Sequence, residues 1–204
     1  TPLPWINVIA NRNFGTIISE SGSSYTWSEN AHGFRLTPWH NDPVSDGCGE
    51  AYYIRDEESG SFWSPMPYPR RDKSSYRSRH GFGYSAFEHT HDGILSEAKI
   101  YVDVEAPIKF VVLKIRNSSG RARKLSATGY IEWVMGNLRY KSAMHVVTEL
   151  DTVTGALVAK NAYNTEFPNR LAFFDVDELQ ANITTDRTEF IGRNGTLSDP
   201  DAMK

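Results

Sequence analysis

Hydrophobic and polar residues alternate over short segments along most of the chain, and turn-forming residues separate these segments. Residues 50–55 and 61–63 predict two short strands joined by the turn sequence DEESG. Residues 84–87 precede a second turn, HDG, and the alternating residues 95–102 follow it. A period of two is typical of strands that are buried on one face, so both segments predict antiparallel hairpins.

The second half of the chain continues this pattern. Residues 110–115 and 125–134 flank the turn sequence NSSGR and predict a third hairpin, and the series is extended by MHVVTELDTVTGALVAKN, RLAFFDVD and ANITTDRTEFIG. No window of a dozen residues has the 3.6-residue period of an amphipathic helix. The chain is therefore predicted to be all-β and antiparallel, with no helix longer than about three turns.

The architecture follows by elimination. Strands without crossover helices cannot build a parallel sheet, so they stack as a sandwich or close as a barrel. The chain has roughly twelve candidate strands, more than the seven to nine of an immunoglobulin-type domain, and it has no repeat of fixed period, which disfavours a propeller. We predict a large antiparallel two-sheet sandwich, with the Pro- and Arg-rich residues 65–80 as an exposed loop that crosses a sheet edge.

Composition narrows the class of protein. The chain has 204 residues, 39% hydrophobic and 23% charged, which is ordinary for a globular domain. Its net charge of -3 and its scattered cations give no basic surface for nucleic acid. Cys48 is the single cysteine, so no internal disulfide forms, and no apolar run approaches the roughly 20 residues that span a bilayer. Because the chain begins with Thr1 rather than Met, we expect it to be a piece of a longer protein.

Histidines and the cysteine offer only weak signals for a metal site or a nucleophile. His89 and His91 are two residues apart, which places both side chains on one strand face, as in some zinc sites. They lie at a predicted turn, however, and no third ligand has a recognisable spacing. We interpret them as surface histidines of a hairpin and predict no metal site. Cys48 lies between two glycines and is a candidate exposed thiol, but nothing places a base beside it.

Paired carboxylates are the groups that catalyse glycosidic bond chemistry. The amino-terminal third of the chain offers five candidates: Glu29, Asp42, Asp46, Glu50 and Asp56. Because a sequence does not give the distances between carboxylates, the interpretation we favour for each is a role in a turn or a salt bridge.

The stretch SYTWSENAHGFRLTPWHNDPVSD, residues 24–46, fits neither a simple strand nor a helix. It gathers aromatic rings, which stack on the C–H faces of sugars, and planar amide, carboxylate and guanidinium groups, which bond to neighbouring hydroxyls. A crossing loop whose polar groups satisfy one another explains the same residue types, so both interpretations stay open. The candidate substrate-binding residues are Trp27, Asn30, Arg35, Trp39, Asn41 and Asp42.

Five motifs between Gly15 and Trp63 carry a resemblance to a known family: G-x-x-x-S, T-W-x-x-N, R-x-T-P-W-x-N-D-P, G-E-x-x-Y-x-R-D and G-x-x-W. With them the chain resembles the amino-terminal β-sandwich domain of glycoside hydrolase family 94, formerly glycosyltransferase family 36, which contains inverting disaccharide phosphorylases. HGFGYSAFEH, MHVVTE and RTEFIGRNGTL resemble, more narrowly, the phosphorylase-like region of bacterial cyclic β-1,2-glucan synthases.

The resemblance implies a galactose-mutarotase-like supersandwich, truncated here, that is followed in the longer enzyme by an (α/α)6 barrel. The barrel supplies the general-acid aspartate and the phosphate site, so residues 1–204 are expected to be non-catalytic. The implied longer enzyme lies in the bacterial inner membrane, with this soluble domain on the cytoplasmic side. It needs no cofactor, since inorganic phosphate and glucose 1-phosphate are substrates.

The partners that the resemblance implies are a β-glucan or oligosaccharide, the enzyme's own barrel and, in a homodimer, a second copy. A loop of the sandwich domain reaches the active site in this family, and residues 27–46 are the candidate for it. An autonomous carbohydrate-binding module and a purely structural or dimerisation domain remain alternative functions.

Overall fold

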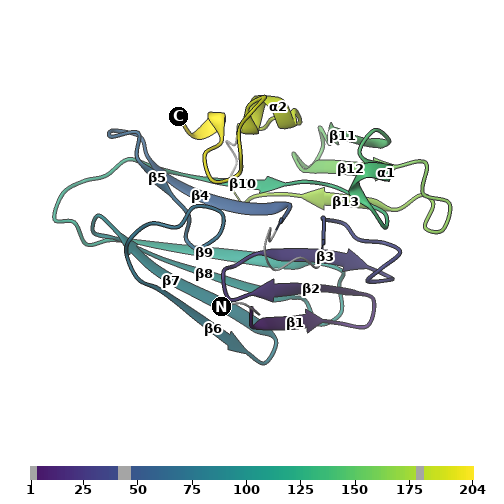
Figure 1. Ribbon diagram of the computed structural model, residues 1–204, viewed down its shortest axis with the longest axis horizontal. Coiled ribbons are helices and arrows are strands. Elements are labelled where there is room, and N and C mark those ends of the chain that lie inside the picture. The colour runs from purple at the N-terminus through teal and green to yellow at the C-terminus, as the bar shows by residue number, and fades with distance from the viewer. Residues whose placement is uncertain (1–3, 41–46, 178–181) are drawn as a thin grey trace.

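A computed structural model describes residues 4–40, 47–177 and 182–204 and shows stacked antiparallel sheets (Figure 1). The described strands are β1 (Ile6–Ala10), β2 (Phe14–Ser19), β3 (Ser24–Ser28), β4 (Glu50–Asp56), β5 (Phe62–Trp63), β6 (Tyr76–Gly81), β7 (Tyr84–His91), β8 (Ile94–Val102), β9 (Lys109–Asn117), β10 (Leu125–Ile131), β11 (Val146–Leu150), β12 (Leu157–Asn161) and β13 (Leu171–Phe174). The short helices are α1 (Arg139–Ser142), α2 (Arg187–Ile191) and the 3-10 turn η1 (Asp201–Met203).

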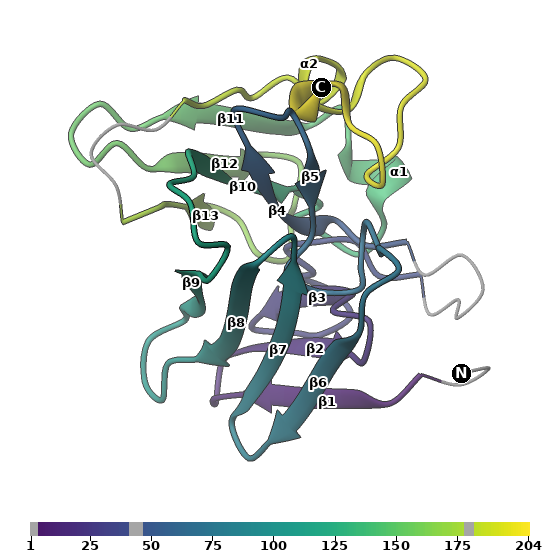
Figure 2. The same cartoon turned by 90° about the vertical axis from the view of Figure 1, so that its left-hand side faces the viewer.

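The strands form four sheets, whose orders are β1-β2-β3, β6-β7-β8-β9, β10-β4-β5 and β11-β12-β13. Figure 2 shows the four-stranded sheet in front of β1, β2 and β3, which run across it. The core lies between these sheets: Ile9 and Ile18 from one share a buried cluster with Phe87 and Ile100 from the other. Ala159 of β12 belongs to the same cluster, so the third layer of strands closes the core from above.

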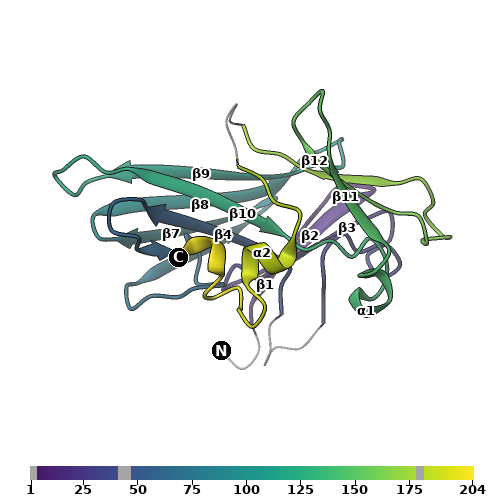
Figure 3. The same cartoon turned by 90° about the horizontal axis from the view of Figure 1, so that it is seen from above.

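Strand β4 is buried on both faces, which explains its nearly continuous run of apolar side chains. Ile54 packs against Trp63 and Ile94 on the inner side. On the outer side, Tyr53 packs with Phe190 of α2 in a second cluster that also contains Ala51, Tyr130, Ile191 and Met203. Figure 3 shows α2 lying across β4 and β10. Strand β4 is also the central strand of its sheet, because it pairs with β10 on one edge and with β5 on the other.

The local predictions are largely confirmed. The described strands pair antiparallel, β4 with β5 and β7 with β8 at the two predicted hairpins. Among the described residues the α-helices span four and five residues, well short of three turns. None of the helices in the described part of the chain has the length and hydropathy needed to cross a membrane.

Three predictions are wrong in detail. Strands β9 and β10 do not form a hairpin, because β9 pairs with β8 and β10 pairs with β4, so the turn between them passes from one sheet to another. The segment ANITTDRTEFIG contains helix α2 instead of a strand, and Asp186 caps it by accepting from two backbone N–H groups. Residues 65–80 are not all exposed loop, since Met66 is buried and β6 begins at Tyr76.

Candidate functional site

Strand β3 (Ser24–Ser28) has two chemically different faces, because side chains alternate along a strand. Ser24 and Thr26 point to the interior and donate their hydroxyls to the carboxylate of Glu50, over 2.7 and 2.6 Å. Tyr25 and Trp27 lie on the other face. The sequence that was expected to form one irregular surface therefore builds an interior site and an outer one.

The outer face carries a row of three rings, Trp27, Tyr25 and Trp39, called here the aromatic row. The centroid of the Tyr25 ring lies 5.4 Å from that of Trp27 and 4.9 Å from that of Trp39, and the second pair is stacked. Tyr25 is buried between the two tryptophans, which are half-buried. Gly15 of the neighbouring strand lies directly under Trp27, since a Cβ at Gly15 would come within 2.4 Å of the Trp27 Cζ2 atom.

Arg35 holds the end of this row in place. Its Nη1 atom donates to the carbonyl oxygens of Trp39 and Asn137, over 3.1 and 3.2 Å, and its Nη2 atom lies 3.1 Å from Nδ1 of His32. Arg35 also bridges β3 to Gly136 through its backbone. Most donors of this guanidinium are thus bonded within the protein, which makes Arg35 a positioning residue for Trp39.

Of the remaining three predicted binding residues, the structure places only Asn30. Asn30 is exposed, and its Oδ1 atom accepts from the backbone N–H groups of His32 and Gly33, which closes a turn beside the row. Asn41 and Asp42 lie outside the described residues. The structure therefore brings together Trp27, Arg35 and Trp39, with Asn30 at the neighbouring turn.

The interior site is built around Glu50 and is called here the Glu50 network: Glu50, Lys109, Ser24, Thr26 and Thr37. Glu50 is only 2% exposed and forms an ion pair with Lys109, whose side chain is itself largely buried. Thr37 donates to Oε1 of Glu50 over 2.7 Å. Burial alone would raise the pKa of Glu50, but the Lys109 cation and the hydroxyl donors outweigh it and lower the pKa.

The remaining carboxylate candidates also have structural partners. Asp56 is buried and accepts from Nε of Arg123 over 2.9 Å, and Glu29 pairs with Arg170 over 2.6 Å. The interpretation as salt-bridge residues is confirmed for Glu29, Glu50 and Asp56, whereas Asp42 and Asp46 lie outside the described residues.

Cys48 is not the exposed thiol that its glycine neighbours suggested. It is buried beside β3, where its Sγ donates to the Ser24 carbonyl over 2.8 Å. Burial raises the pKa of Cys48 to about 11, and the nearby Glu50 carboxylate raises it further. The thiol is therefore protonated at neutral pH and is a poor nucleophile.

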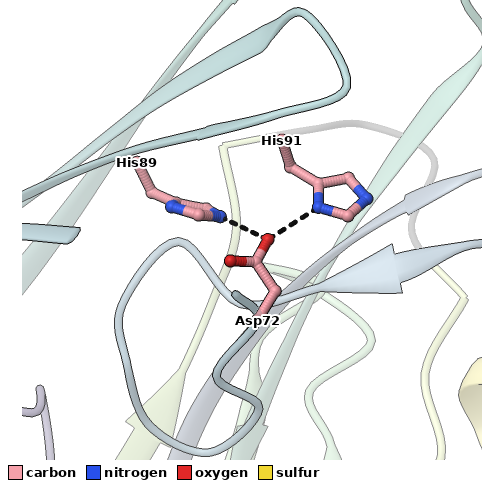
Figure 4. Close-up of side chains that lie close together, drawn as sticks. All are labelled: Asp72, His89 and His91. Atoms are coloured by element: carbon pink, nitrogen blue, oxygen red, sulfur yellow. Dashed lines mark hydrogen bonds and ion pairs between the residues drawn. The ribbon is translucent and has the colours of Figure 1, made fainter. Parts of the chain in front are cut away.

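The interpretation of His89 and His91 as surface histidines of a hairpin is confirmed only in part. Both lie on β7 of the β7–β8 hairpin, before the turn, and His91 is partly exposed, but His89 is buried and only 3% exposed. Asp72, from the connection between β5 and β6, lies between the two rings (Figure 4). Sequence spacing could not find Asp72, because it is 17 residues from His89 and meets it only in the fold.

Sequence reasoning also missed Tyr25, the middle ring of the aromatic row. Its signal was present, since Tyr25 and Trp27 are two residues apart and share a face if the segment is a strand. The irregular composition of residues 24–46 hid that short period of two.

Comparison with known proteins gives one family over the full chain. The family described as "Glycosyl hydrolase 94, supersandwich domain" matches residues 1–204. Cyclic beta-(1,2)-glucan synthase NdvB of Rhizobium meliloti (strain 1021) is 45% identical over 204 residues, which cover 100% of this chain and 7% of that protein.

Two groups of disaccharide phosphorylases are more distant relatives. N,N'-diacetylchitobiose phosphorylase of Vibrio furnissii is 28% identical over 99% of this chain and 26% of its own length. Solabiose phosphorylase of Paenibacillus borealis is 26% identical over 100% of this chain and 27% of its own length. The chain thus spans about a quarter or less of the relatives it matches.

Proposed function

Because the chain belongs to the supersandwich domains of glycosyl hydrolase family 94, we propose that it is a non-catalytic module of an enzyme that makes or phosphorolyses a β-1,2-glucan. The glucan is proposed over a disaccharide because the relative named a cyclic beta-(1,2)-glucan synthase is 45% identical over the 204 aligned residues, whereas a chitobiose phosphorylase is 28% identical over 213. In this role the module supports the architecture of an active site that another domain supplies.

The aromatic row carries the carbohydrate part of the proposal. Trp27 and Trp39 lie half-buried on either side of the buried Tyr25 ring, and half-buried tryptophans lose little conformational entropy when a ligand stacks on them. The Arg35 guanidinium donates to the Trp39 backbone carbonyl and holds this residue in place before a ligand arrives, so the row is preorganised. A glucan chain offers C–H faces for these rings and hydroxyls for the polar groups at the Asn30 turn.

The non-catalytic part rests on the carboxylates. In the part of the chain that the structure describes, Glu29, Glu50 and Asp56 are each held by a cation, and Glu50 and Asp56 are buried away from solvent. An acid catalyst needs access to the glycosidic oxygen, which these two side chains lack. This favours a catalytic acid on another domain, as the family resemblance implies.

Titration calorimetry with linear β-1,2-gluco-oligosaccharides tests the proposal on the 204-residue chain. We expect weak, saturable binding that Trp27→Ala and Trp39→Ala each abolish. Phe82→Ala is the matched control, because this ring is fully exposed at the β6–β7 turn, outside the row. The chain should release no glucose 1-phosphate from the glucan in the presence of phosphate. Equal binding by all three variants, or phosphorolysis by the purified chain, would contradict the proposal.

An interface role is the second candidate, and the outer face of β11-β12-β13 favours it. Val147, Leu171 and Phe173 are more than half exposed there, on the side opposite the core. The ion pair of Lys160 with Glu149 lies on the same face. Exposed apolar side chains grouped beside such polar residues are typical of a surface that another domain or a second copy covers. Sedimentation velocity separates these roles. A wild-type dimer that Phe173→Glu dissociates would indicate a dimerisation domain. If the wild-type chain and the variant are both monomers, the glucan-binding role is favoured.

A further inference from the structure

A second cluster with chemical potential lies apart from the aromatic row, where the connection before β6 meets strand β7. Oδ2 of Asp72 lies 2.9 Å from Nε2 of His89 and 2.7 Å from Nδ1 of His91 (Figure 4). The three ligand atoms lie within 4.8 Å of one another. The two histidines share a face of β7 because they are two residues apart, and the fold supplies the aspartate.

Both ring nitrogens of His89 face hydrogen-bond acceptors, but a neutral imidazole has only one N–H to donate. Its Nδ1 atom lies 3.2 Å from the carbonyl oxygen of Ser75, which only accepts, so Nδ1 carries a proton. Its Nε2 atom faces the Asp72 carboxylate, which also accepts when ionised. A neutral imidazole has a single N–H, so Nε2 needs either a second proton or a cation between itself and Asp72.

The surroundings of the three side chains match the outer shell of a metal site. A metal-binding histidine usually donates its other N–H to a backbone carbonyl, as His89 does to Ser75. The Ser74 backbone N–H donates to Oδ1 of Asp72 over 2.7 Å and leaves Oδ2 to the histidines. The His89 ring is stacked on Tyr76 at 3.8 Å, and the His91 ring is stacked on Trp63 at 4.4 Å. The two rings are thus oriented by packing.

We propose that Asp72, His89 and His91 bind a divalent transition metal ion, with Zn²⁺ the best fit to two imidazoles and one carboxylate. A tetrahedral zinc ion with bonds of about 2.0–2.1 Å holds its ligand atoms roughly 3.3 Å apart. Binding therefore moves the Asp72 oxygen away from the two rings, and it brings closer any pair of ligand atoms that is farther apart than this, within the present limit of 4.8 Å. The side chain of His91 is 26% exposed and that of Asp72 is 20% exposed, which leaves solvent access for a fourth ligand, water.

The ion would fasten the long connection between β5 and β6 to the four-stranded sheet. Asp72 belongs to that connection, and both histidines belong to β7. The proposed role is structural, because the ion would join two segments that are separate in the sequence.

Zinc titration of the chelator-treated chain tests the proposal. At neutral pH we expect calorimetry to show one Zn²⁺ per chain and melting curves to show a higher Tm with zinc. His91→Ala and Asp72→Asn should each weaken binding by about a hundredfold or more, because loss of an outer-shell partner alone costs ten- to a hundredfold. Asp72→Asn keeps the acceptor for the Ser74 N–H, and His91 is partly exposed, so both variants should fold. His40→Ala is the control, an exposed histidine outside the cluster.

Histidine ring NMR separates the metal site from a charged histidine. With zinc bound, the His89 ring should carry a proton on Nδ1 alone, and Co²⁺ in place of zinc should give the visible bands of a tetrahedral or five-coordinate site. The proposal would be overturned if the wild-type chain bound no stoichiometric zinc and its His89 ring were doubly protonated both with and without zinc in the buffer. It would also be overturned if His91→Ala and Asp72→Asn left zinc binding unchanged. Glucan binding at the aromatic row is measured separately and does not bear on this outcome.

Discussion

The two faces of strand β3 carry different side chains and lie in different surroundings. On the inner face, Ser24 and Thr26 belong to the Glu50 network, where a buried carboxylate has a cation and three hydroxyl donors. On the outer face, Tyr25 and Trp27 belong to the aromatic row, where the buried Tyr25 ring lies between two tryptophans that remain partly open to solvent. The inner face stabilises the fold, and the outer face is the one that we propose binds a ligand.

This difference shows that a polar, aromatic stretch is not in itself a binding site. Glu50 has the residue type of a catalytic group but the environment of a structural one, because every partner it has lies within the protein. The rings of Trp27 and Trp39 differ from Glu50, because they are only half-buried and part of each ring is open to solvent. Substitutions on the two faces should therefore separate stability from ligand binding.

The largest effect is expected from Lys109→Met, which leaves Glu50 buried without its cation. Breaking one partner of a buried pair costs about 3–5 kcal/mol, so urea denaturation should show a loss of unfolding free energy of that order. Lys114→Met is the matched control, because Lys114 lies on the same strand β9 with a side chain that is 73% exposed. Equal losses from the two variants would contradict a structural role for the Glu50 network.

Acid should reveal the same network through Glu50 itself. Its pKa in the folded chain is below the ordinary value of 4.5, so the ionised carboxylate stabilises the fold above about pH 4.5. That contribution is lost as the pH falls through the lowered pKa. Unfolding free energies measured from neutral to acidic pH should therefore fall less steeply in Glu50→Gln than in the wild type. Parallel pH profiles would show that Glu50 does not titrate with a lowered pKa.

A smaller effect is expected where the aromatic row touches the sheet beneath it. In Gly15→Ala the new methyl group would come within 2.4 Å of Trp27 and 2.7 Å of the Ala10 Cβ atom, and such overpacking costs about 1–3 kcal/mol. The same substitution should cost less in a Trp27→Ala background, because the ring it meets is gone. An unchanged cost in that background, by thermal or urea denaturation, would place the strain elsewhere.

The smallest effect on stability is expected from Trp39→Ala. The ring stacks on Tyr25 but is half-buried. An aromatic pair contributes about 0.5–1.5 kcal/mol beyond the apolar area that it buries, so with little area buried the loss should be about 1–2 kcal/mol. Trp39→Phe should recover most of it. If Trp39→Ala lost as much unfolding free energy as Lys109→Met, Trp39 would serve mainly to stabilise the fold, and the two faces would not differ in role.

The sequence pattern predicted the local features of this molecule and missed those that depend on distant partners. The β7–β8 hairpin was predictable because its turn and its alternation are both local. The residues between β9 and β10 look like a hairpin turn as well, and only the position of β4 shows that the chain changes sheets there. Helix α2 is five residues long, too short to establish a helical period.

The candidate sites show the same limit. Trp27 and Trp39 were found by residue type, whereas the role of Arg35 in holding the Trp39 backbone depends on the loop conformation. Asp72 could not be assigned to His89 and His91, because nothing in the intervening 16 residues fixes their approach. Burial of Cys48 and Glu50 likewise follows from the packing of β3 against β4 and β9.

Tryptophan indole NMR tests the central claim most directly, that the outer face of β3 binds glucan and the inner face does not. The chain has five tryptophans, so each indole N–H signal can be assigned with single Trp→Phe variants. On titration with linear β-1,2-gluco-oligosaccharides, the signals of Trp27 and Trp39 should shift and saturate together, while that of the buried Trp63 stays in place. Unmoved signals from Trp27 and Trp39 at saturating glucan would contradict the account.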